Sequence, residues 1–431
     1  MQSKLQVCNA LFRTIPFLTT GALAMTTVLA VTVVLIQPTQ AQTFKVIHTF
    51  AGGGDGATPW AGLTMDQVGN LYGTTCGNDC GGAGTAGNVF RLSKNGSGWI
   101  FNPLYNFAGG NGGTNPHAGV VFGPHGILYG TTPYTGGNGC GSTCGTVFSL
   151  KPRPTACKSA LCSWTETVLR DFTGGSDGAA PAFGDVVFDG AGNLYGTTLF
   201  GGTYSSGTVF ELAPSGSGWT ENILYSLTGG SDGGFPYAGL IFDKAGNLYG
   251  TASGGGAYGA GTVFELTPSG SSWTANTLYS FTGGSDGGYP YAGLVFDQAG
   301  ALYGATIIGG QAGGGTVFKL TPSSGTWTYS LVYSLNGPGG AYCGPTANLI
   351  TDAAGNLYGT TQCAGGYGKG SVFKLTPSGG NWTYTSLHDF GGFSDGANPV
   401  GPLMLDASGN LYGTAANGGG SGLGVAFEIS P

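Results

Sequence analysis

Seven loops of this 431-residue chain contain an equivalent proline, and the residue that follows it varies in chemistry from loop to loop. Aromatic or imidazole rings occupy this position in four loops, as Trp60, His117, Tyr237 and Tyr291, and the other three loops have Ala182, Thr346 and Val400. Flat rings that surround a pocket can hold a sugar ring or an apolar ligand, with a few polar groups for orientation. We therefore take the four rings as a candidate binding site, with ordinary packing between loops as the alternative.

A serine in these loops matches the G-x-S-x-G pattern of serine hydrolases. Residues 229–233 read GGSDG, and similar segments contain Ser176, Ser285 and Ser394. A nucleophile elbow needs a strand before the serine and a helix after it, so that a strained turn exposes the hydroxyl. A proline and a strand-like segment follow here instead, so the pattern predicts a loop and no catalytic serine.

Five of the loops also carry an aspartate, at Asp55, Asp177, Asp232, Asp286 and Asp395. Carboxylate and backbone oxygens are the ligands that calcium prefers, but each loop supplies one carboxylate where a calcium site uses several. The alternative is a turn in which the carboxylate accepts hydrogen bonds from neighbouring backbone N–H groups. We expect the turn.

Little in the chain indicates catalysis. His48 and His388 stand at a strand position that is tyrosine in other repeats, and the other two histidines lack a repeated acidic partner. Asp185 breaks the repeat at what we take as the equivalent of Leu240, and we expect it to line the centre of the molecule. Glycosidases normally use two carboxylates. We therefore favour a binding protein, and the alternative is an enzyme that acts on extracellular polysaccharide as a glycosidase or lyase, with its site at the channel mouth.

These residues recur because the chain is built from a repeat. The sequence LYG or its close variants returns at spacings of 54 to 66 residues, with its tyrosine at Tyr72, Tyr129, Tyr195, Tyr249, Tyr303, Tyr358 and Tyr412. Each unit contains four strand-like runs bounded by turn residues, which in the fourth unit are 239–242, 247–250, 262–266 and 273–281, with turns at 243–246 and 268–270. Seven units of four antiparallel strands predict an all-β protein, a seven-bladed β-propeller.

The two ends of the repeat region complement each other. Residues 44–50 resemble the fourth strand of a unit, whereas the last unit supplies only three strands, at 403–405, 411–413 and 425–427. We therefore predict that the N-terminal strand joins the C-terminal blade, which closes the ring and hides its edges. In such a ring, the loops from the fourth strand to the next first strand share a face with the loops from the second strand to the third.

The first 41 residues have the features of a signal peptide. Lys4 and Arg13 precede an apolar run at residues 17–36, and Thr39-Gln40-Ala41 is a small-x-small cleavage site. The apolar run approaches the length that spans a bilayer, so an uncleaved anchor is the alternative. We expect residues 1–41 to direct residues 42–431, the propeller, to the periplasm, the cell envelope or the medium, with no membrane span in the mature chain.

The amino-acid composition limits the kinds of partner that we expect for this chain. The chain has 89 glycines, only 8% charged residues and a formal net charge of −7. Binding to a phosphate backbone needs clustered lysine and arginine, so we do not expect nucleic acid as a partner. The G-x-G-x-x-G matches are not followed by a helix, so they do not indicate a nucleotide cofactor. We expect a monomer without a cofactor.

Eight cysteines follow the leader, an even number that is typical of an oxidising compartment. We expect four local disulfides, because three pairs coincide with lengthened loops and the fourth pair lies in loops that share a face. The pairs are Cys76 with Cys80, Cys140 with Cys144, Cys157 with Cys162, and Cys343 with Cys363. A zinc site formed by the first four of these cysteines is the alternative, although no histidine spacing accompanies them.

The repeat resembles a known family. Residues 189–198, 207–212 and 219–233 carry its pattern D-x-x-G-N-L-Y-G-T-T, G-T-V-F-x-L and W-T-x-x-x-L-Y-S-x-T-G-G-S-D-G, which is similar to the GloVer tandem-repeat family of bacterial secreted proteins. Members of this family end in different surface-anchoring tails, whereas this sequence ends inside its last strand pattern. The resemblance implies no established activity. We therefore expect a secreted binding or structural module at or outside the cell envelope, with an extracellular glycan or an envelope protein as its partner.

Overall fold

The computed structural model describes residues 42–77, 86–134, 144–152, 164–181, 183–270, 272–337 and 342–431. The expected leader at residues 1–41 lies outside the described residues, as do Ala182, Cys80, Cys140, Cys157 and Cys162. The chain from Ala41 to Pro431 forms one compact unit. Within the described part of the chain, no helix combines the length and the apolar character needed to cross a bilayer.

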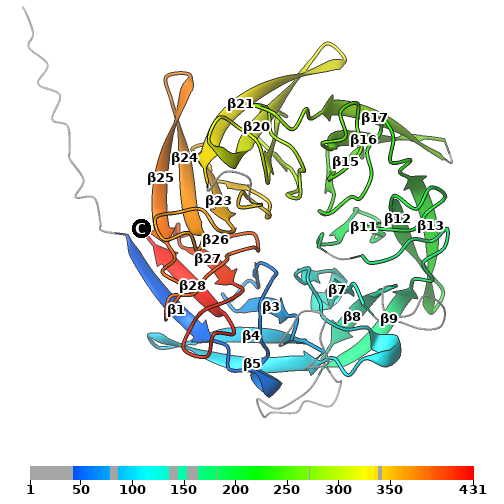
Figure 1. The fold of residues 1–431 in the computed structure, drawn as a ribbon. Coiled ribbons are helices and arrows are strands. Elements are labelled where there is room, and N and C mark those ends of the chain that lie inside the picture. The colour runs from blue at the N-terminus through cyan, green and yellow to red at the C-terminus, as the bar shows by residue number, and fades with distance from the viewer. Residues whose placement is uncertain are drawn as a thin grey trace, which may run out of the picture. The chain divides into compact units, whose positions relative to one another are not determined.

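The described residues form seven four-stranded antiparallel sheets that follow one another around a ring (Figure 1). This architecture confirms the predicted seven-bladed β-propeller. Blades 1 to 4 contain β2 (Thr64–Met65), β3 (Leu71–Thr75), β4 (Asn88–Asn95) and β5 (Gly98–Asn106); β6 (Val121–Phe122), β7 (Leu128–Thr132), β8 (Thr146–Lys151) and β9 (Thr165–Asp171); β10 (Val187–Phe188), β11 (Leu194–Thr198), β12 (Thr208–Ser215) and β13 (Gly218–Ser226); and β14 (Ile241–Phe242), β15 (Leu248–Ala252), β16 (Thr262–Ser269) and β17 (Ser272–Ser280).

The remaining three blades repeat the same order from the innermost to the outermost strand. They contain β18 (Val295–Phe296), β19 (Leu302–Thr306), β20 (Gly313–Ser323) and β21 (Thr326–Asn336); β22 (Ile350–Thr351), β23 (Leu357–Thr361), β24 (Ser371–Ser378) and β25 (Asn381–Asp389); and β26 (Met404–Leu405), β27 (Leu411–Ala415), β28 (Val425–Ser430) and β1 (Thr43–Thr49). Short 3₁₀ turns occur in the described residues at Gly53–Asp55, Gly110–Gly112 and Pro124–Gly126.

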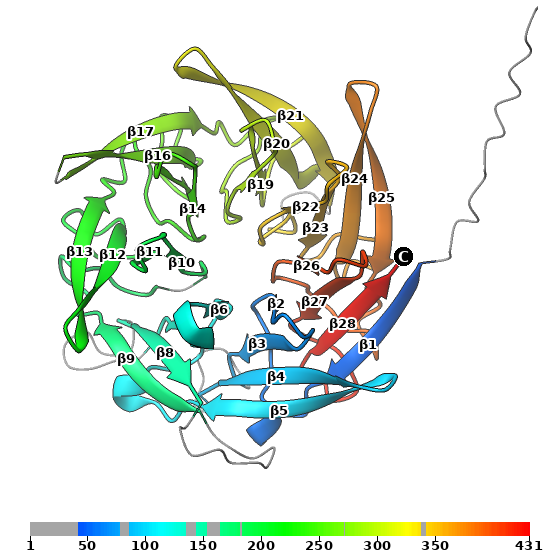
Figure 2. The same cartoon turned by 180° about the vertical axis from the view of Figure 1, so that it is seen from behind.

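The ring closes through the first strand, as the chain ends predicted. β1 pairs antiparallel with β28, with Thr43 opposite Ser430 and Thr49 opposite Val425, and both views of the ring show the two strands side by side (Figure 2). Phe50, which follows β1, is fully buried in a cluster that joins blades 7 and 1. Across the same junction, the Thr414 hydroxyl donates a 2.6 Å hydrogen bond to the carbonyl of Ala61. The closing blade is therefore bonded to its neighbour as other blades are.

Two local expectations differ from the structure. The first strand of blade 4 is only Ile241–Phe242, where the chain pairs with Tyr249 and Leu248, and Gly239 before it packs against the backbone of Asp185 in blade 3. The turn expected at residues 268–270 begins later, since β16 runs to Ser269 with Pro268 opposite Trp273. β15 pairs with β16 only as far as Leu266. Beyond that point β16 has no inner neighbour, so a proline without an N–H breaks no hydrogen bond there.

The aspartate of the D-x-x-G-N-L-Y segment organises the hairpin between the first two strands. In blade 4, Asp243 accepts hydrogen bonds from the backbone N–H groups of Ala245 and Asn247 at 2.8 and 2.9 Å. Its second oxygen accepts the Asn247 amide at 2.8 Å and the Tyr249 hydroxyl at 3.2 Å. Burial alone raises the pKa of Asp243, but these hydrogen bonds lower it overall. One carboxylate therefore fixes both the turn and the tyrosine of LYG.

The glycine of LYG is required by a close contact between the second and third strands. In blade 4, a Cβ placed on Gly250 would lie 2.5 Å from the ring of Phe264 and 2.9 Å from the Leu240 side chain. The corresponding glycine of every other blade has a phenylalanine ring at 2.5–2.7 Å from the same position. The glycine thus leaves room for the buried phenylalanine of the neighbouring strand.

Aromatic side chains on the outer strands join neighbouring blades. The Trp327 ring of blade 5 packs edge-on against Tyr249 of blade 4, with ring centres 5.9 Å apart. Trp382 of blade 6 makes the same contact with Tyr303 of blade 5, at 6.0 Å. These contacts confirm that the repeated tyrosines and tryptophans are packing residues.

We predict that Gly250→Ala destabilises the propeller by about 1–3 kcal/mol, because the added methyl group overpacks the Phe264 contact. Gly190→Ala is the matched control, because a Cβ at this position meets no atom within 4 Å. Urea unfolding monitored by tryptophan fluorescence measures both variants. Equal midpoints for Gly250→Ala and the control would contradict the steric explanation.

Candidate binding site

A cavity of about 240 Å³ lies at the centre of the ring, and residues of all seven blades line it. Most of the lining comes from the loops between the fourth strand of one blade and the first strand of the next. The four rings proposed from the sequence, Trp60, His117, Tyr237 and Tyr291, all line this cavity. The structure therefore brings the predicted residues together in one place.

Five rings from five consecutive blades form a continuous stack, which we call the aromatic stack: Trp60, His117, Phe183, Tyr237 and Tyr291. The closest pair is Phe183 and Tyr237, whose ring centres lie 3.8 Å apart with an interplanar angle of 8°. Tyr237 and Tyr291 follow at 4.3 Å and 15°. Thr346 and Val400 hold the equivalent positions in blades 6 and 7, so the stack stops there.

Phe183 is the member of the stack that counting forward from the loop proline missed. That count selects Ala182, which lies outside the described residues. Blade 3 has one extra residue between Pro181 and the hairpin aspartate Asp189, compared with the other blades. Counting backward from Asp189 selects Phe183. The extra residue in this segment is therefore the sequence feature that could have identified Phe183 as the fifth ring.

His117 is buried within the stack, with ring centres 5.2 Å from Trp60 and 4.9 Å from Phe183. Its side chain is enclosed, and neither Nδ1 nor Nε2 has a hydrogen-bond partner among the described residues. Burial lowers the pKa of His117 from its ordinary value of 6.5 to about 4, so the ring is neutral at pH 7. The stack thus contains two unpaired ring nitrogens beside the cavity.

We call the residue two positions after each ring of the aromatic stack, and its equivalent in blades 6 and 7, the floor position; most of these residues line the cavity. The structure corrects the alignment of Asp185 here, because Val186 is the buried residue equivalent to Leu240 and Asp185 is equivalent to Gly239. Asp185 does line the cavity, as expected. The seven residues at the floor position are Gly62, Gly119, Asp185, Gly239, Gly293, Asn348 and Pro402.

Asp185 and Asn348 each reach back to the preceding blade. The N–H of Gly119 donates to Oδ1 of Asp185 at 2.7 Å, and the N–H of Gly293 donates to Oδ1 of Asn348 at 2.6 Å. Burial raises the pKa of Asp185, and the Gly119 hydrogen bond opposes this only in part. The Asp185 carboxylate and the Asn348 amide are thus held in fixed orientations in the cavity lining.

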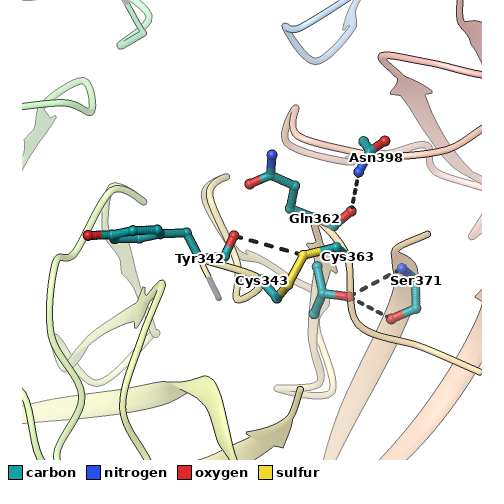
Figure 3. Close-up of a disulfide and its surroundings, with 7 residues drawn as sticks. Tyr342, Cys343, Gln362, Cys363, Ser371 and Asn398 are labelled. Atoms are coloured by element: carbon teal, nitrogen blue, oxygen red, sulfur yellow. Dashed lines mark hydrogen bonds between the residues drawn. A yellow bond between two sulfur atoms is a disulfide. The ribbon is translucent and has the colours of Figure 1, made fainter. Parts of the chain in front are cut away.

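The loops around the cavity share one face, as the ring geometry predicted. In blade 5, Gly288 of one loop forms a β-bridge with Ile308 of the other. In blade 6 the equivalent residues are Cys343 and Cys363, which form a disulfide with a Cα–Cα distance of 4.7 Å (Figure 3). The close-up shows that the adjacent Tyr342 extends away from the sulfur atoms, and its side chain reaches the cavity lining.

The Cys343–Cys363 pairing agrees with the prediction. Cys76 and Cys144 are also in disulfides, and the cysteines expected to pair with them lie outside the described residues. The pairing of Cys157 with Cys162 falls entirely outside them and stays a prediction. In the described part of the chain, no three His, Cys, Asp or Glu side chains gather as a metal site.

The loop aspartates form turns. Each accepts the backbone N–H four residues earlier and bonds the side chain seven residues earlier, which is His48, Arg170, Tyr225, Tyr279 or His388. Asp232, for example, accepts the Thr228 N–H and the Tyr225 hydroxyl, both at 2.9 Å. The two strand histidines therefore replace tyrosine as partners of an aspartate, and the carboxylates are engaged within their own loops.

We predict that His117→Phe makes the protein less sensitive to acid. Because the pKa of His117 is lower in the folded chain than its ordinary 6.5, the unfolded chain binds the proton first, and stability falls as the pH drops from 6.5 towards 4. At pH 5 this effect amounts to about 2 kcal/mol. Urea unfolding at pH 7 and pH 5 should show a smaller difference for the variant than for the wild type.

The control is His125→Asn, on an exposed turn with a φ of 60°, a conformation that asparagine tolerates. It should keep the acid sensitivity of the wild type. The same loss of stability in His117→Phe as in the wild type would show that His117 is not the group responsible.

Comparisons with known proteins locate the chain in a family and give little beyond it. No curated protein matches the sequence. Among solved structures, a protein assigned as a 6-phosphogluconolactonase from Bacteroides uniformis has 14% identity and a TM-score of 0.49, covering 82% of this chain and 89% of its own. An oxidoreductase from Thermus thermophilus assigned as a glucose dehydrogenase has 14% identity and a TM-score of 0.44, covering 90% and 99%.

A gluconolactonase from Xanthomonas campestris has 13% identity and a TM-score of 0.38, covering 66% of this chain and 78% of its own. At these identities and scores, the solved structures carry no argument about activity. The model of the Gloeobacter/Verrucomicrobia repeat, by contrast, matches residues 138–344 and 275–431. These two segments include more than half of the sequence, and the chain belongs to the Gloeobacter/Verrucomicrobia repeat family.

Proposed function

We propose that this protein is a secreted carbohydrate-binding module that holds one sugar ring of a glycan chain at the mouth of its central channel. The observation that carries the proposal is the aromatic stack, five rings from five blades that line a single cavity. A packing role alone explains rings that recur in every blade. The stack differs, because it stops at Thr346 and Val400 and borders a space.

The size and lining of the cavity agree with a sugar ring. Its volume of about 240 Å³ is below the range of about 300–1,000 Å³ for pockets that enclose drug-sized ligands. Trp60 and Tyr291 end the stack, and each has a ring neighbour from the stack on one side only. The exposed face of such a ring can pack against the C–H groups of a sugar, while Asn348 and Gln362 supply amides for its hydroxyls.

Exposed aromatic side chains on the same face favour a chain over a single sugar. They lie in the loops that surround the cavity, and their exposed fractions reach 81% at Phe393 and 66% at Tyr258. The set also includes Phe200, Tyr204, Phe235, Tyr342 and Tyr367. Exposed apolar groups gathered on one face mark an interaction site. A glycan that enters the mouth with one residue can lie across these rings with the others.

Binding also agrees better than cleavage with the charged groups present. Asp185 is the one carboxylate among the described residues that line the cavity. Hydrolysis of glycosidic bonds by the usual mechanisms employs a second carboxylate 5–10 Å away, as a rough range. Analysis of products after incubation with polysaccharides tests the enzymatic alternative directly, and shortened chains would favour it.

Secretion is supported by the sequence features of residues 1–41 and by the disulfide between Cys343 and Cys363, which is typical of oxidising compartments. Residues 1–41 serve in this proposal as a signal peptide, and residues 42–431 as the binding domain. The partner is a glycan outside the cytoplasm.

We predict that Trp60→Ala weakens glycan binding at least tenfold, because it removes the terminal ring of the aromatic stack. A glycan array identifies the bound glycans for the wild type, and calorimetry with the best of them measures both proteins. Val68→Ala is the control, since Val68 is 84% exposed in a hairpin outside the cavity lining. Unchanged affinity in Trp60→Ala, with an unchanged melting temperature, would show that the stack does not bind the glycan.

We predict that the secreted protein begins at Gln42, because cleavage after Ala41 follows the small-x-small pattern. Expression of the full chain in a bacterium and N-terminal sequencing of the exported product measures this. Ala41→Trp is the control, since a bulky residue before the cleavage point should block processing. An exported chain that retains its N-terminus would favour the anchor.

A further inference from the structure

We propose that the sugar held in the cavity carries an ammonium group and that Asp185 binds this group, so that the ligand class is an amino sugar. This inference rests on the proposed function, because it concerns the same cavity. It follows from the floor position, which is glycine or proline in five blades and a polar side chain in two.

Asp185 replaces a residue without a side-chain charge at a crowded place. In blade 4, a Cβ on Gly239 would collide with the backbone carbonyl of Asp185. In blade 2, a Cβ on Gly119 would come within 3.1 Å of Oδ1 of Asp185. Packing explains the glycines at this position, but it does not explain a carboxylate there. Since the other blades fold without one, the fold does not require Asp185.

The Asp185 carboxylate is held by one of its two oxygens. Its only hydrogen bond in the described residues runs from the Gly119 N–H to Oδ1, at 2.7 Å. Oδ2 is not among the enclosed atoms that lack a partner, and the residue lines the cavity. One oxygen is therefore anchored to blade 2, and the other is available to a group inside the cavity.

The Asp185 carboxylate has no counter-charge among the described residues of the cavity lining. The described lining of the cavity contains no lysine or arginine, and its one histidine, His117, is neutral at pH 7. Burial raises the pKa of Asp185, because a carboxylate removed from water is costly unless a cation or several hydrogen bonds compensate it, and an ammonium ligand would stabilise the charged form. An ammonium group supplies both the charge and up to three donors. A hydroxyl supplies one uncharged donor, and charge-assisted hydrogen bonds are roughly twice as strong.

The surroundings favour an ammonium group further. Phe183 of the aromatic stack is two residues before Asp185, and both residues line the cavity. Cations are attracted to aromatic rings as well as to carboxylates. Asn348, at the floor position of blade 6, remains for the hydroxyl groups of the sugar.

The test compares sugars that differ only at one carbon. Calorimetry on the purified protein measures glucosamine against glucose and N-acetylglucosamine, and galactosamine against galactose. We expect at least one amino sugar to bind tenfold or more tightly than its neutral counterparts. The variant Asp185→Asn keeps an acceptor for the Gly119 N–H and removes the charge. It should reduce the preference to less than threefold.

Asp232→Asn is the matched control, because it removes the same charge from a loop aspartate outside the cavity lining. It should leave the preference intact, and equal melting temperatures would show that the variants are folded. Neutral sugars that bind as tightly as amino sugars, or a preference that survives in Asp185→Asn, would overturn the inference and leave the proposed function standing. An absence of binding for all five sugars and for the glycan array would instead overturn the proposed function.

Discussion

The contact between the glycine of LYG and a phenylalanine on the next strand is the constraint on which the propeller depends. In blade 4 the Phe264 ring lies so close to Gly250 that no side chain fits between them, and Leu240 closes the same gap from the inner strand. The three residues join the three inner strands of the blade at one point. Because the arrangement repeats in all seven blades, the chain can vary its loops without changing the path of its core.

The similarity of the strands in all blades explains where the candidate binding residues lie. The strands repeat the same side chains, and the differences between blades gather at the ends of the strands that face the cavity. Trp60 and His117 stand where Val400 stands in blade 7, and Asp185 stands where most blades have glycine. Five of the seven loops that carry these differences are held by an aspartate that accepts hydrogen bonds within its own loop, so the differences do not disturb the strands. Seven blades of the same architecture thus carry a candidate site whose residues differ from blade to blade.

Much of the fold and part of the candidate site could be predicted from the sequence, because the repeat period shows where each unit begins and ends. The period gave the number of blades, the incomplete last unit predicted the pairing of β1 with β28, and the four rings at the cavity were found by counting from the prolines. The two misses in blade 3 had a common cause. One inserted residue before Asp189 shifted the alignment of blade 3, which hid Phe183 and misplaced Asp185. The burial of His117 depends on packing between three blades, and no local pattern encodes such packing.

The disulfide in blade 6 stands where blade 5 has the β-bridge between Gly288 and Ile308. A bridge of this kind consists of hydrogen bonds that each contribute about 1 kcal/mol, so the two loops can part briefly by thermal breathing. The Cys343–Cys363 bond removes that freedom in blade 6. The loops of blade 6 beside Tyr342 are therefore more rigid than the equivalent loops of blade 5. A bulky ligand would enter the cavity more easily past blade 5.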